Sequence, residues 1–134
     1  MRIATWNVNS LKARLDAVGN WLERGAPDVL LMQETKLSDD DAPVMPFAMA
    51  GYDLVHHGEG RWNGVAIAIR QGTQVDEVET NFGDRPVRDS GAGAAVEVSE
   101  EDFDPFDEAR MLSVRLSPPG SAPFRIVSLY GPNG

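Results

Sequence analysis

Polar residues replace apolar ones abruptly after position 32, and this change is the clearest pattern in the chain. Residues 29–32 form an unbroken apolar run, which Pro27 and Asp28 introduce. A short run that is apolar on both faces is typical of a strand buried in a sheet covered on both sides. Polar residues 33–36 follow at once. Ligands bind open α/β sheets where strands end, so Glu34 is a candidate site residue, although a solvated strand-end glutamate would give the same pattern.

The residues before this run predict a strand and then a helix. Residues 2–8 alternate in the manner of a strand, and Ser10 is a good helix N-cap. Apolar residues then recur at helical spacing, at Leu11, Leu15, Val18 and Leu22. A strand, a helix and a strand within ~35 residues form a βαβ unit, whose right-handed crossover makes the strands parallel. Asn7 and Glu34 are therefore expected to meet at one edge of the sheet.

Further strands are predicted at residues 52–57, 62–70, 74–79, 110–116 and 124–130, and a loop or short helical turn at 38–46. The first two strands flank two glycines and are expected to form a hairpin. Adjacent strand residues point to opposite faces, so His56 and His57 are interpreted as ordinary strand-end side chains rather than a catalytic pair. Trp62 is either a packed lid or an exposed ring facing a substrate.

Composition indicates one modest globular domain. The chain has 134 residues, 42% hydrophobic and 25% charged, which is ordinary for a soluble protein. The absence of cysteine excludes disulfides and thiolate metal sites and favours a reducing compartment, for which we expect the cytoplasm. We expect no membrane association, because the chain shows no leader-like N-terminus and no apolar run near the ~20 residues that span a bilayer.

The net charge of −9 argues against a general nucleic-acid coat, because such binding needs clustered lysine and arginine. The excess acid is densest at residues 97–108, within a segment (84–108) that we interpret as an acidic loop insertion. This loop is expected to project away from any polyanion. An acidic chain can still bind a polyanion where cations face the site and a divalent metal supplies further positive charge.

A carboxylate beside an amide carbonyl is a pair of hard oxygen donors, which suits Mg²⁺, or Mn²⁺, rather than zinc. Mg²⁺ usually takes one or two carboxylates and leaves its other positions to water and substrate phosphate. The alternative for Asn7 is a strand-end amide that only hydrogen-bonds to backbone.

Five motifs in this order resemble a known family. They are WNVNSLKAR (6–14), PDVLLMQETK (27–36), NGVAI (63–67), EAR (108–110) and LYGPNG (129–134). Together they resemble the N-terminal half of exonuclease III and the apurinic/apyrimidinic endonucleases of DNA base-excision repair, within the endonuclease/exonuclease/phosphatase superfamily. QET alone is shared by the superfamily, whereas WNVNSLKAR joined to QETK is more specific to the DNA-repair branch.

The resemblance implies an α/β (α+β) fold, a two-sheet sandwich flanked by helices, and Mg²⁺-dependent hydrolysis of DNA at abasic sites and 3′ ends. Asn7 and Glu34 match the family's metal ligands, and Tyr130 matches a tyrosine that contacts the scissile phosphate. Positions that lie beside the metal or DNA in similar enzymes correspond to Asn9, Lys36, Trp62 and Asn133. The expected partner is duplex DNA with abasic sites or 3′ ends.

The family's later motifs, which resemble GDFN and SDH and supply a general base and a histidine, do not occur in this sequence. We therefore expect residues 1–134 to be the N-terminal part, about half, of one larger domain that is monomeric when complete. The chain alone is expected to be inactive. Because each sheet of a sandwich buries a face against the other, we also expect an exposed apolar face at Val65, Ile67 and Ile69.

Two alternatives remain open from the residues. One is a phosphodiesterase of the same superfamily that acts on RNA or a phospholipid head group, against which WNVNSLKAR argues. The other is a non-catalytic acidic interaction module, which the intact set of Asn7, Glu34 and Tyr130 makes less favourable.

Overall fold

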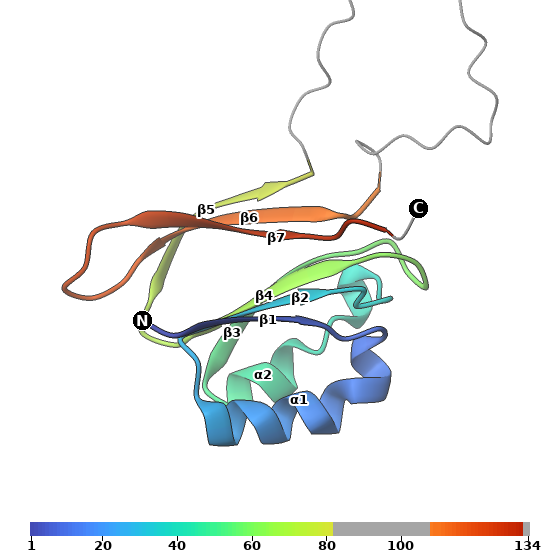
Figure 1. The fold of residues 1–134 in the computed structure, drawn as a ribbon, viewed down its shortest axis with the longest axis horizontal. Coiled ribbons are helices and arrows are strands. Elements are labelled where there is room, and N and C mark those ends of the chain that lie inside the picture. Colours follow the sequence, from blue (N-terminus) through green and yellow to red (C-terminus); the bar gives the residue numbers. More distant parts are fainter. Residues whose placement is uncertain (82–107, 133–134) are drawn as a thin grey trace, which may run out of the picture.

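The computed structural model describes residues 1–81 and 108–132, which form two facing sheets with helices against one of them (Figure 1). The elements in chain order are β1 (Ile3–Asn7), α1 (Leu11–Gly25), β2 (Val29–Gln33), the 3₁₀ turn η1 (Asp39–Asp41), α2 (Val44–Met49), β3 (Tyr52–His57), β4 (Val65–Arg70), β5 (Gln74–Thr80), β6 (Met111–Ser117) and β7 (Phe124–Leu129). The predicted two-sheet α/β sandwich is confirmed. The proposed acidic insertion lies outside the described residues, except for Glu108 at its end.

The first sheet has the strand order β1-β2-β4-β3. β1 and β2 are parallel, in a register that runs from Ile3 opposite Val29 to Asn7 opposite Gln33. β2 pairs antiparallel with β4, and β4 with β3, as the hairpin prediction required. Since β1 and β2 run in the same direction and in this register, their carboxyl ends lie side by side.

The βαβ crossover follows from local chemistry. The Ser10 hydroxyl accepts the Ala13 backbone N–H at 3.3 Å, which caps α1 at its start. Leu11, Val18 and Leu22 are buried against the sheet. α2 covers the same outer face with Phe47 and extends further than the short turn that the sequence predicted. In the part of the chain that the structure describes, no helix is long and apolar enough to cross a membrane.

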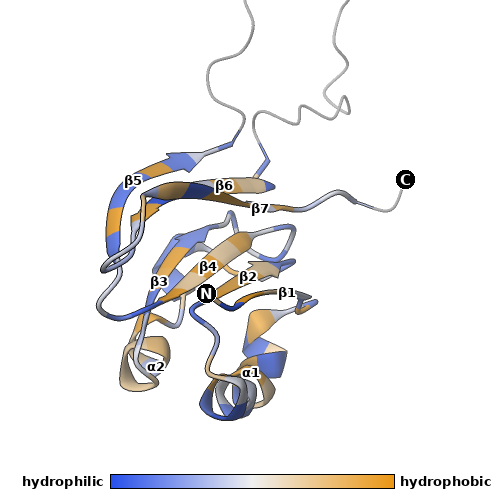
Figure 2. Ribbon diagram, turned by 60° about the vertical axis from the view of Figure 1, so that its left-hand side comes forward, coloured by the Kyte–Doolittle hydropathy of each residue, from blue (hydrophilic) through white to orange (hydrophobic). Residues whose placement is uncertain are grey.

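The second sheet is antiparallel, with the order β5-β6-β7. It covers the inner face of β4, so Val65, Ile67 and Ile69 are each 0% exposed and pack in one cluster with residues of β6: Leu112, Val114 and Leu116. The expectation that this face of β4 is exposed is therefore wrong. The reason is that β6 and β7 supply the covering layer from within the chain. In Figure 2 the central strands β2 and β4 are almost entirely hydrophobic (orange), as strands covered on both sides must be.

Candidate functional site at the carboxyl ends of β1, β2 and β7

Three strands end together at one side of the sandwich. Asn7 is the last residue of β1, Glu34 directly follows β2, and Tyr130 directly follows β7. The first two belong to one sheet and the third to the other. The site is therefore assembled across the gap between the two sheets, from residues that the sequence separates by up to 123 positions.

Asn7 and Glu34 are in direct contact. The Asn7 Nδ2 donates to Glu34 Oε1 at 3.1 Å, and the Asn7 Oδ1 accepts the backbone N–H of Asn9 at 3.1 Å. Backbone bonds hold the β1–α1 connection against the segment after β2: the Ser10 N–H donates to the Glu34 carbonyl at 2.8 Å and the Leu11 N–H to the Thr35 carbonyl at 2.9 Å. The two segments are thus fixed to each other through their backbones as well as their side chains.

The backbone around Glu34 is unusual. Glu34 and Lys36 both have φ of 54°, the left-handed region that side-chain-bearing residues rarely adopt. Between them, Thr35 is fully buried and its N–H donates to the Gly64 carbonyl at 3.1 Å. Gly64 is needed for this approach, because a Cβ there would lie 2.2 Å from Thr35 Oγ1. The loop between β3 and β4 therefore supports the strained segment that presents Glu34.

Lys36 places a positive charge beside the carboxylate. Its Nζ donates to Asn9 Oδ1 at 2.6 Å and lies 3.8 Å from Glu34 Oε2. Both charged side chains are partly accessible to solvent, with 31% of Lys36 and 24% of Glu34 exposed. A phosphate that approaches Glu34 would therefore meet a cation as well as the carboxylate.

Tyr130 faces the same carboxylate. Burial raises the pKa of its hydroxyl above the ordinary 10, and the negative charge of Glu34 and a hydrogen bond to that carboxylate raise it further. The Tyr130 N–H donates to the Arg110 carbonyl at 2.8 Å, which fixes the backbone of the tyrosine. The hydroxyl thus remains protonated at neutral pH and can donate a hydrogen bond.

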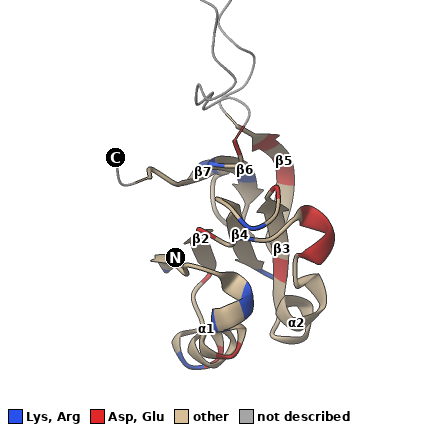
Figure 3. Ribbon diagram, turned by 90° about the vertical axis from the view of Figure 1, so that its right-hand side faces the viewer, with Lys and Arg blue, Asp and Glu red and all other residues tan. Residues whose placement is uncertain are grey.

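Trp62 is 65% exposed, so its interpretation as a packed lid is wrong. The loop is held instead by its neighbour Asn63, whose Nδ2 donates to Glu108 Oε2 at 3.0 Å, and the indole remains outside. The guanidinium of Arg61 lies over the Trp62 ring, 5.5 Å from its centroid. Figure 3, which looks onto this end of the molecule, shows acidic and basic segments close together there. The last candidate residue, Asn133, lies outside the described residues.

The two histidines have different partners, which agrees with the strand geometry. The His56 side chain is 4% exposed and lies between Thr35 Oγ1, 2.8 Å from its Nε2, and Asp39 Oδ1, 2.7 Å from its Nδ1. Burial lowers the pKa of His56, although Asp39 opposes that shift, so the ring is neutral at neutral pH. His57 contacts Asn81 instead, with Nε2 2.9 Å from Asn81 Oδ1. His56 therefore supports the segment after Glu34 rather than forming a catalytic pair.

Sequence reasoning gave no role to three contacts near the site. Two of them join His56 to Thr35 and to Asp39, which lie 21 and 17 positions away, and no sequence period links these residues. Arg110, which lies 2.5 Å from Glu108 Oε2 through its Nη2, appeared only as part of the EAR motif. That motif was the one available signal for it.

The donor set fits Mg²⁺ or Mn²⁺ in type. Glu34 supplies carboxylate oxygens, and a turn of the Asn7 amide about its last side-chain bond would direct Oδ1 to the same ion. Within residues 1–81 and 108–132, no group of three or more His, Cys, Asp and Glu could hold a metal ion. These residues therefore provide part of a coordination sphere, and the remaining positions would be filled by water, phosphate or further ligands.

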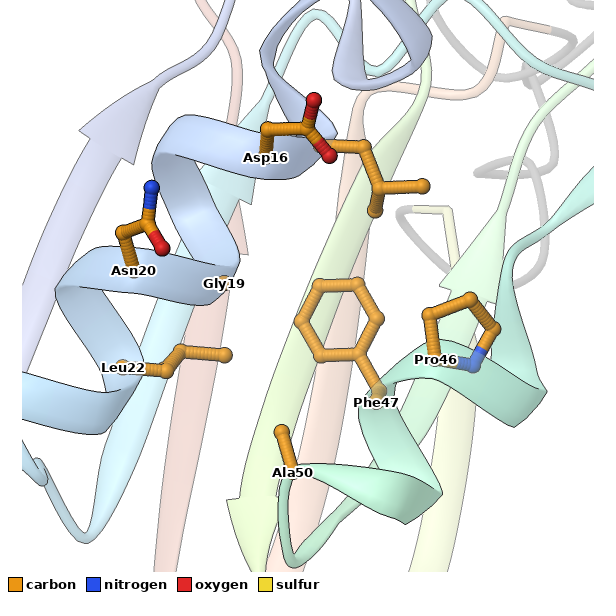
Figure 4. Close-up of a pocket in the computed structure, with 8 residues that line it drawn as sticks. Asp16, Gly19, Asn20, Leu22, Pro46, Phe47 and Ala50 are labelled. Atoms are coloured by element: carbon orange, nitrogen blue, oxygen red, sulfur yellow. The ribbon is translucent and has the colours of Figure 1, made fainter.

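The strand-end residues do not line the groove shown in Figure 4. This groove, with a volume of about 530 Å³, lies between α1 and α2 and is mainly apolar. Its lining consists of Leu15, Asp16, Gly19, Asn20, Leu22, Pro46, Phe47 and Ala50. The apolar groove and the oxygen donors of the candidate site are thus in different places on this molecule.

Comparisons with known proteins find relatives of this chain. The chain is 33% identical over 75 residues to an exodeoxyribonuclease III from Haemophilus influenzae, a match that covers 56% of this chain and 28% of that protein. An AP endonuclease from Archaeoglobus fulgidus has a similar structure, with a TM-score of 0.67, 32% identity and coverage of 87% of this chain and 37% of that one. A 3′ phosphatase from Neisseria bound to a product DNA hairpin has a TM-score of 0.69, 30% identity and coverage of 97% and 41%.

The chain therefore spans well under half the length of each of these relatives. The resemblance to exonuclease III and AP endonucleases that the motifs indicated is confirmed. Residues 4–125, which are most of the sequence, match the sequence pattern of one protein family. The chain belongs to the Endonuclease/Exonuclease/phosphatase family.

Proposed function

We propose that the protein containing this chain is a Mg²⁺-dependent nuclease of DNA repair that hydrolyses DNA phosphodiesters at abasic sites and at 3′ ends. The observation that carries this proposal is the convergence of Asn7, Glu34 and Tyr130 at one end of the sandwich. The names of the similar proteins support the substrate class. Because the chain spans 28–41% of these relatives, the activity is proposed for the whole protein.

Glu34 and Asn7 would hold the ion, which when bound would offset negative charge on the phosphoryl oxygens and the leaving group. The Tyr130 hydroxyl, kept protonated beside Glu34, would donate to a non-bridging phosphate oxygen. Releasing this hydroxyl from Glu34 costs little when a phosphate oxygen replaces the carboxylate as acceptor. The same residues therefore have one set of partners without substrate and another with it.

Lys36 and Asn9 would contact the DNA backbone beside the scissile phosphate, since their side chains already meet at this edge. Trp62 presents an exposed ring against which a base or sugar can pack. Asn133 is proposed for the same surface from the family resemblance alone. The monomeric state and the cytoplasmic location remain predictions.

The test is hydrolysis by the complete protein of a duplex with one abasic site, with Mg²⁺, with chelator, and with Mg²⁺ restored. A second panel contains an unmodified 3′ end, a 3′-phosphorylated end, an RNA duplex and a phospholipid head-group ester. We expect chelator to abolish cleavage, Mg²⁺ to restore it, and DNA to be preferred. Preference for RNA or the lipid ester would assign the protein to another branch of the family. No metal-dependent hydrolysis of any substrate would favour a non-catalytic module.

A matched pair of variants connects the activity to the site. Asn7→Ala should lower kcat about 10- to 100-fold. Asn20→Ala removes the same amide from the exposed surface of α1 and should leave kcat unchanged. Equal activities of the two variants would contradict the role proposed for Asn7.

A further inference from the structure

A polar cluster joins the two sheets immediately behind the candidate site, and it consists of the buried Gln33 and Ser128 together with the exposed Thr5 of β1. Gln33 is 9% exposed and Ser128 is 0% exposed. The Gln33 Nε2 donates to Ser128 Oγ at 3.1 Å and to Thr5 Oγ1 at 3.1 Å. The Ser128 hydroxyl in turn donates to the Met32 carbonyl at 3.0 Å. One amide and two hydroxyls thus connect β1, β2 and β7.

The cluster occupies a place where apolar side chains would be expected. Residues two apart on a strand share a face, and Val29 and Leu31, which share the face of Gln33, pack in the apolar cluster between the sheets. On β7, Phe124 and Ile126 do the same on the face of Ser128. A buried amide is unfavourable unless its hydrogen bonds are made, whereas an apolar side chain fills such a position without that requirement. The cluster therefore calls for an explanation other than filling space.

Each residue of the cluster lies one or two positions before a candidate site residue on the same strand or at its end. Thr5 precedes Asn7 by two positions on β1, and Ser128 precedes Tyr130 by two positions along β7. Gln33 directly precedes Glu34. Each strand that carries a candidate site residue is thus tied to the others within two residues of it.

Hydrogen bonds are directional, and apolar contacts between sheets are not. β1 and β2 are already held in register by their ladder, but β7 belongs to the other sheet and shares no ladder with them. The contacts of His57 with Asn81 and of Asn63 with Glu108 join other segments of the two sheets. Without the link from Gln33 to Ser128, the end of β7 can shift relative to β1 and β2 and so change the distance from Tyr130 to Glu34. Displacements of ~1 Å can lower a catalytic rate by ~100-fold.

We propose that Gln33 is a positioning residue which, through Ser128 and Thr5, fixes the ends of β1, β2 and β7 so that Asn7, Glu34 and Tyr130 keep their reactive spacing. The proposal rests on the proposed function of the same site. It assigns to the glutamine that precedes Glu34 a role in geometry across the two sheets, with no direct contact to metal or phosphate.

The test compares two buried serines in the complete protein. Ser128→Ala removes the hydroxyl that joins the sheets. Ser113→Ala removes a hydroxyl that is equally buried (3% exposed) but accepts from Arg125 Nη1 at 3.1 Å, away from Gln33. We expect Ser128→Ala to lower kcat about 10- to 100-fold with KM within about twofold, and Ser113→Ala to change neither. Thermal unfolding of both variants separates an effect on geometry from an effect on stability.

Thr5 offers a rescue experiment. It is exposed on an edge strand, so changes of its side chain should disturb the packing little. Thr5→Val keeps the shape of the side chain but removes the hydroxyl, and should lower kcat several-fold. Thr5→Ser keeps the hydroxyl and should restore the wild-type value. A deficit of equal size in both variants would mean that side-chain volume, and not hydrogen bonding, matters at this position, and would contradict the proposal.

Mn²⁺ binding, followed by electron paramagnetic resonance, separates this proposal from the proposed function. Ser128→Ala should weaken Mn²⁺ binding about tenfold, and Ser113→Ala should not. A complete protein that cleaves DNA while Ser128→Ala retains wild-type kcat and Mn²⁺ affinity would overturn the positioning role and leave the function intact. If the wild type does not cleave, the Mn²⁺ affinities decide, and equal affinities or no binding at all would overturn the proposal.

Discussion

Two groups of side chains with nearly the same chemistry lie at opposite ends of β2. Each contains a carboxylate, a cation and a tyrosine: Asp28, Arg70 and Tyr52 at the amino-terminal end, and Glu34, Lys36 and Tyr130 at the carboxyl-terminal end. Composition alone therefore does not distinguish a structural cluster from a candidate site. The distinction lies in the partners of each group.

At the amino-terminal end the polar groups are bound to backbone. The Tyr52 hydroxyl donates to the Pro27 carbonyl at 2.7 Å, and Arg70 Nη2 donates to the same carbonyl at 3.2 Å. Asp28 accepts the Arg2 N–H at 2.6 Å, which is the main reason why its pKa is lowered. Asp28 and Arg70 also pair with each other, with Oδ1 3.6 Å from Nε, but each is bound to backbone as well. A ligand could not displace these backbone bonds without disturbing the fold.

At the carboxyl-terminal end the partners are other side chains. Glu34 contacts Asn7, Lys36 and Tyr130, and Lys36 contacts Asn9. Side chains can rotate away, so an ion or phosphate can replace these contacts one at a time. Exchangeable partners, rather than residue types, mark the end of the sheet where binding can occur.

The largest expected difference in activity is between variants of the two carboxylates, Glu34 and Asp28. Glu34→Gln in the complete protein should lower kcat on an abasic duplex by at least about 100-fold, because the proposed metal ion would lose the carboxylate that holds it. Asp28→Asn should retain activity within about twofold. Steady-state kinetics of both variants measure this. Similar activities would remove the functional distinction between the two ends.

The two tyrosines should separate activity from stability. Tyr130→Phe is expected to lower kcat about tenfold or more and leave the free energy of unfolding nearly unchanged, because its hydroxyl faces Glu34 and is proposed to contact the phosphate. Tyr52→Phe should do the reverse and lower the free energy of unfolding by ~1 kcal/mol, because a buried hydrogen bond to Pro27 is lost. Kinetics and urea unfolding of each variant give the two values. A stability loss confined to Tyr130→Phe would reverse our assignment.

The two cations should differ in DNA affinity. Lys36→Gln is expected to raise KM a few-fold and to reduce the slope of log affinity against log salt concentration by about 1. Arg70→Gln should leave that slope unchanged, because Arg70 lies at the other end of the sheet. Binding isotherms at three salt concentrations provide the slopes. Equal slopes in both variants would argue against a phosphate contact by Lys36.

The smallest effect concerns acid stability. Asp28 has a lowered pKa in the folded chain, so its ionised form stabilises the fold above the unfolded value of about 3.9, and this contribution is lost as pH falls through the lower folded value. The unfolding temperature of Asp28→Asn should therefore fall less steeply below pH 4 than that of the wild type. Asp16→Asn, an exposed change on α1, is the control and should follow the wild-type curve.

Much of this arrangement could be predicted from local pattern and chain handedness. The alternation before Asn7, the Ser10 cap and the apolar run before Glu34 were enough to place both residues at one sheet edge, because a βαβ crossover has a single favoured hand. The place of Tyr130 beside them came from the family resemblance, and the structure brings it to Glu34.

The remaining features depend on packing between distant segments. The link from Gln33 to Ser128 spans 95 positions, and no period in the sequence indicates it. The coverage of Ile67 by β6 requires knowing how the two sheets stack. The exposed Trp62 lies next to Asn63, which is held by Glu108 from 45 positions away. Such contacts are properties of the assembled fold and leave no local signal.

The left-handed backbone at Glu34 and Lys36 has a consequence for protein engineering. A side-chain-bearing residue in this conformation costs on the order of 1 kcal/mol, and glycine adopts it without that cost. A directed-evolution campaign that rewards heat resistance alone would therefore enrich glycine at position 36 and remove the cation beside the carboxylate. Selection for activity at low DNA concentration would restore lysine, because loss of Lys36 is expected to raise KM. The strained segment is thus a position where thermostability and catalysis are expected to compete directly.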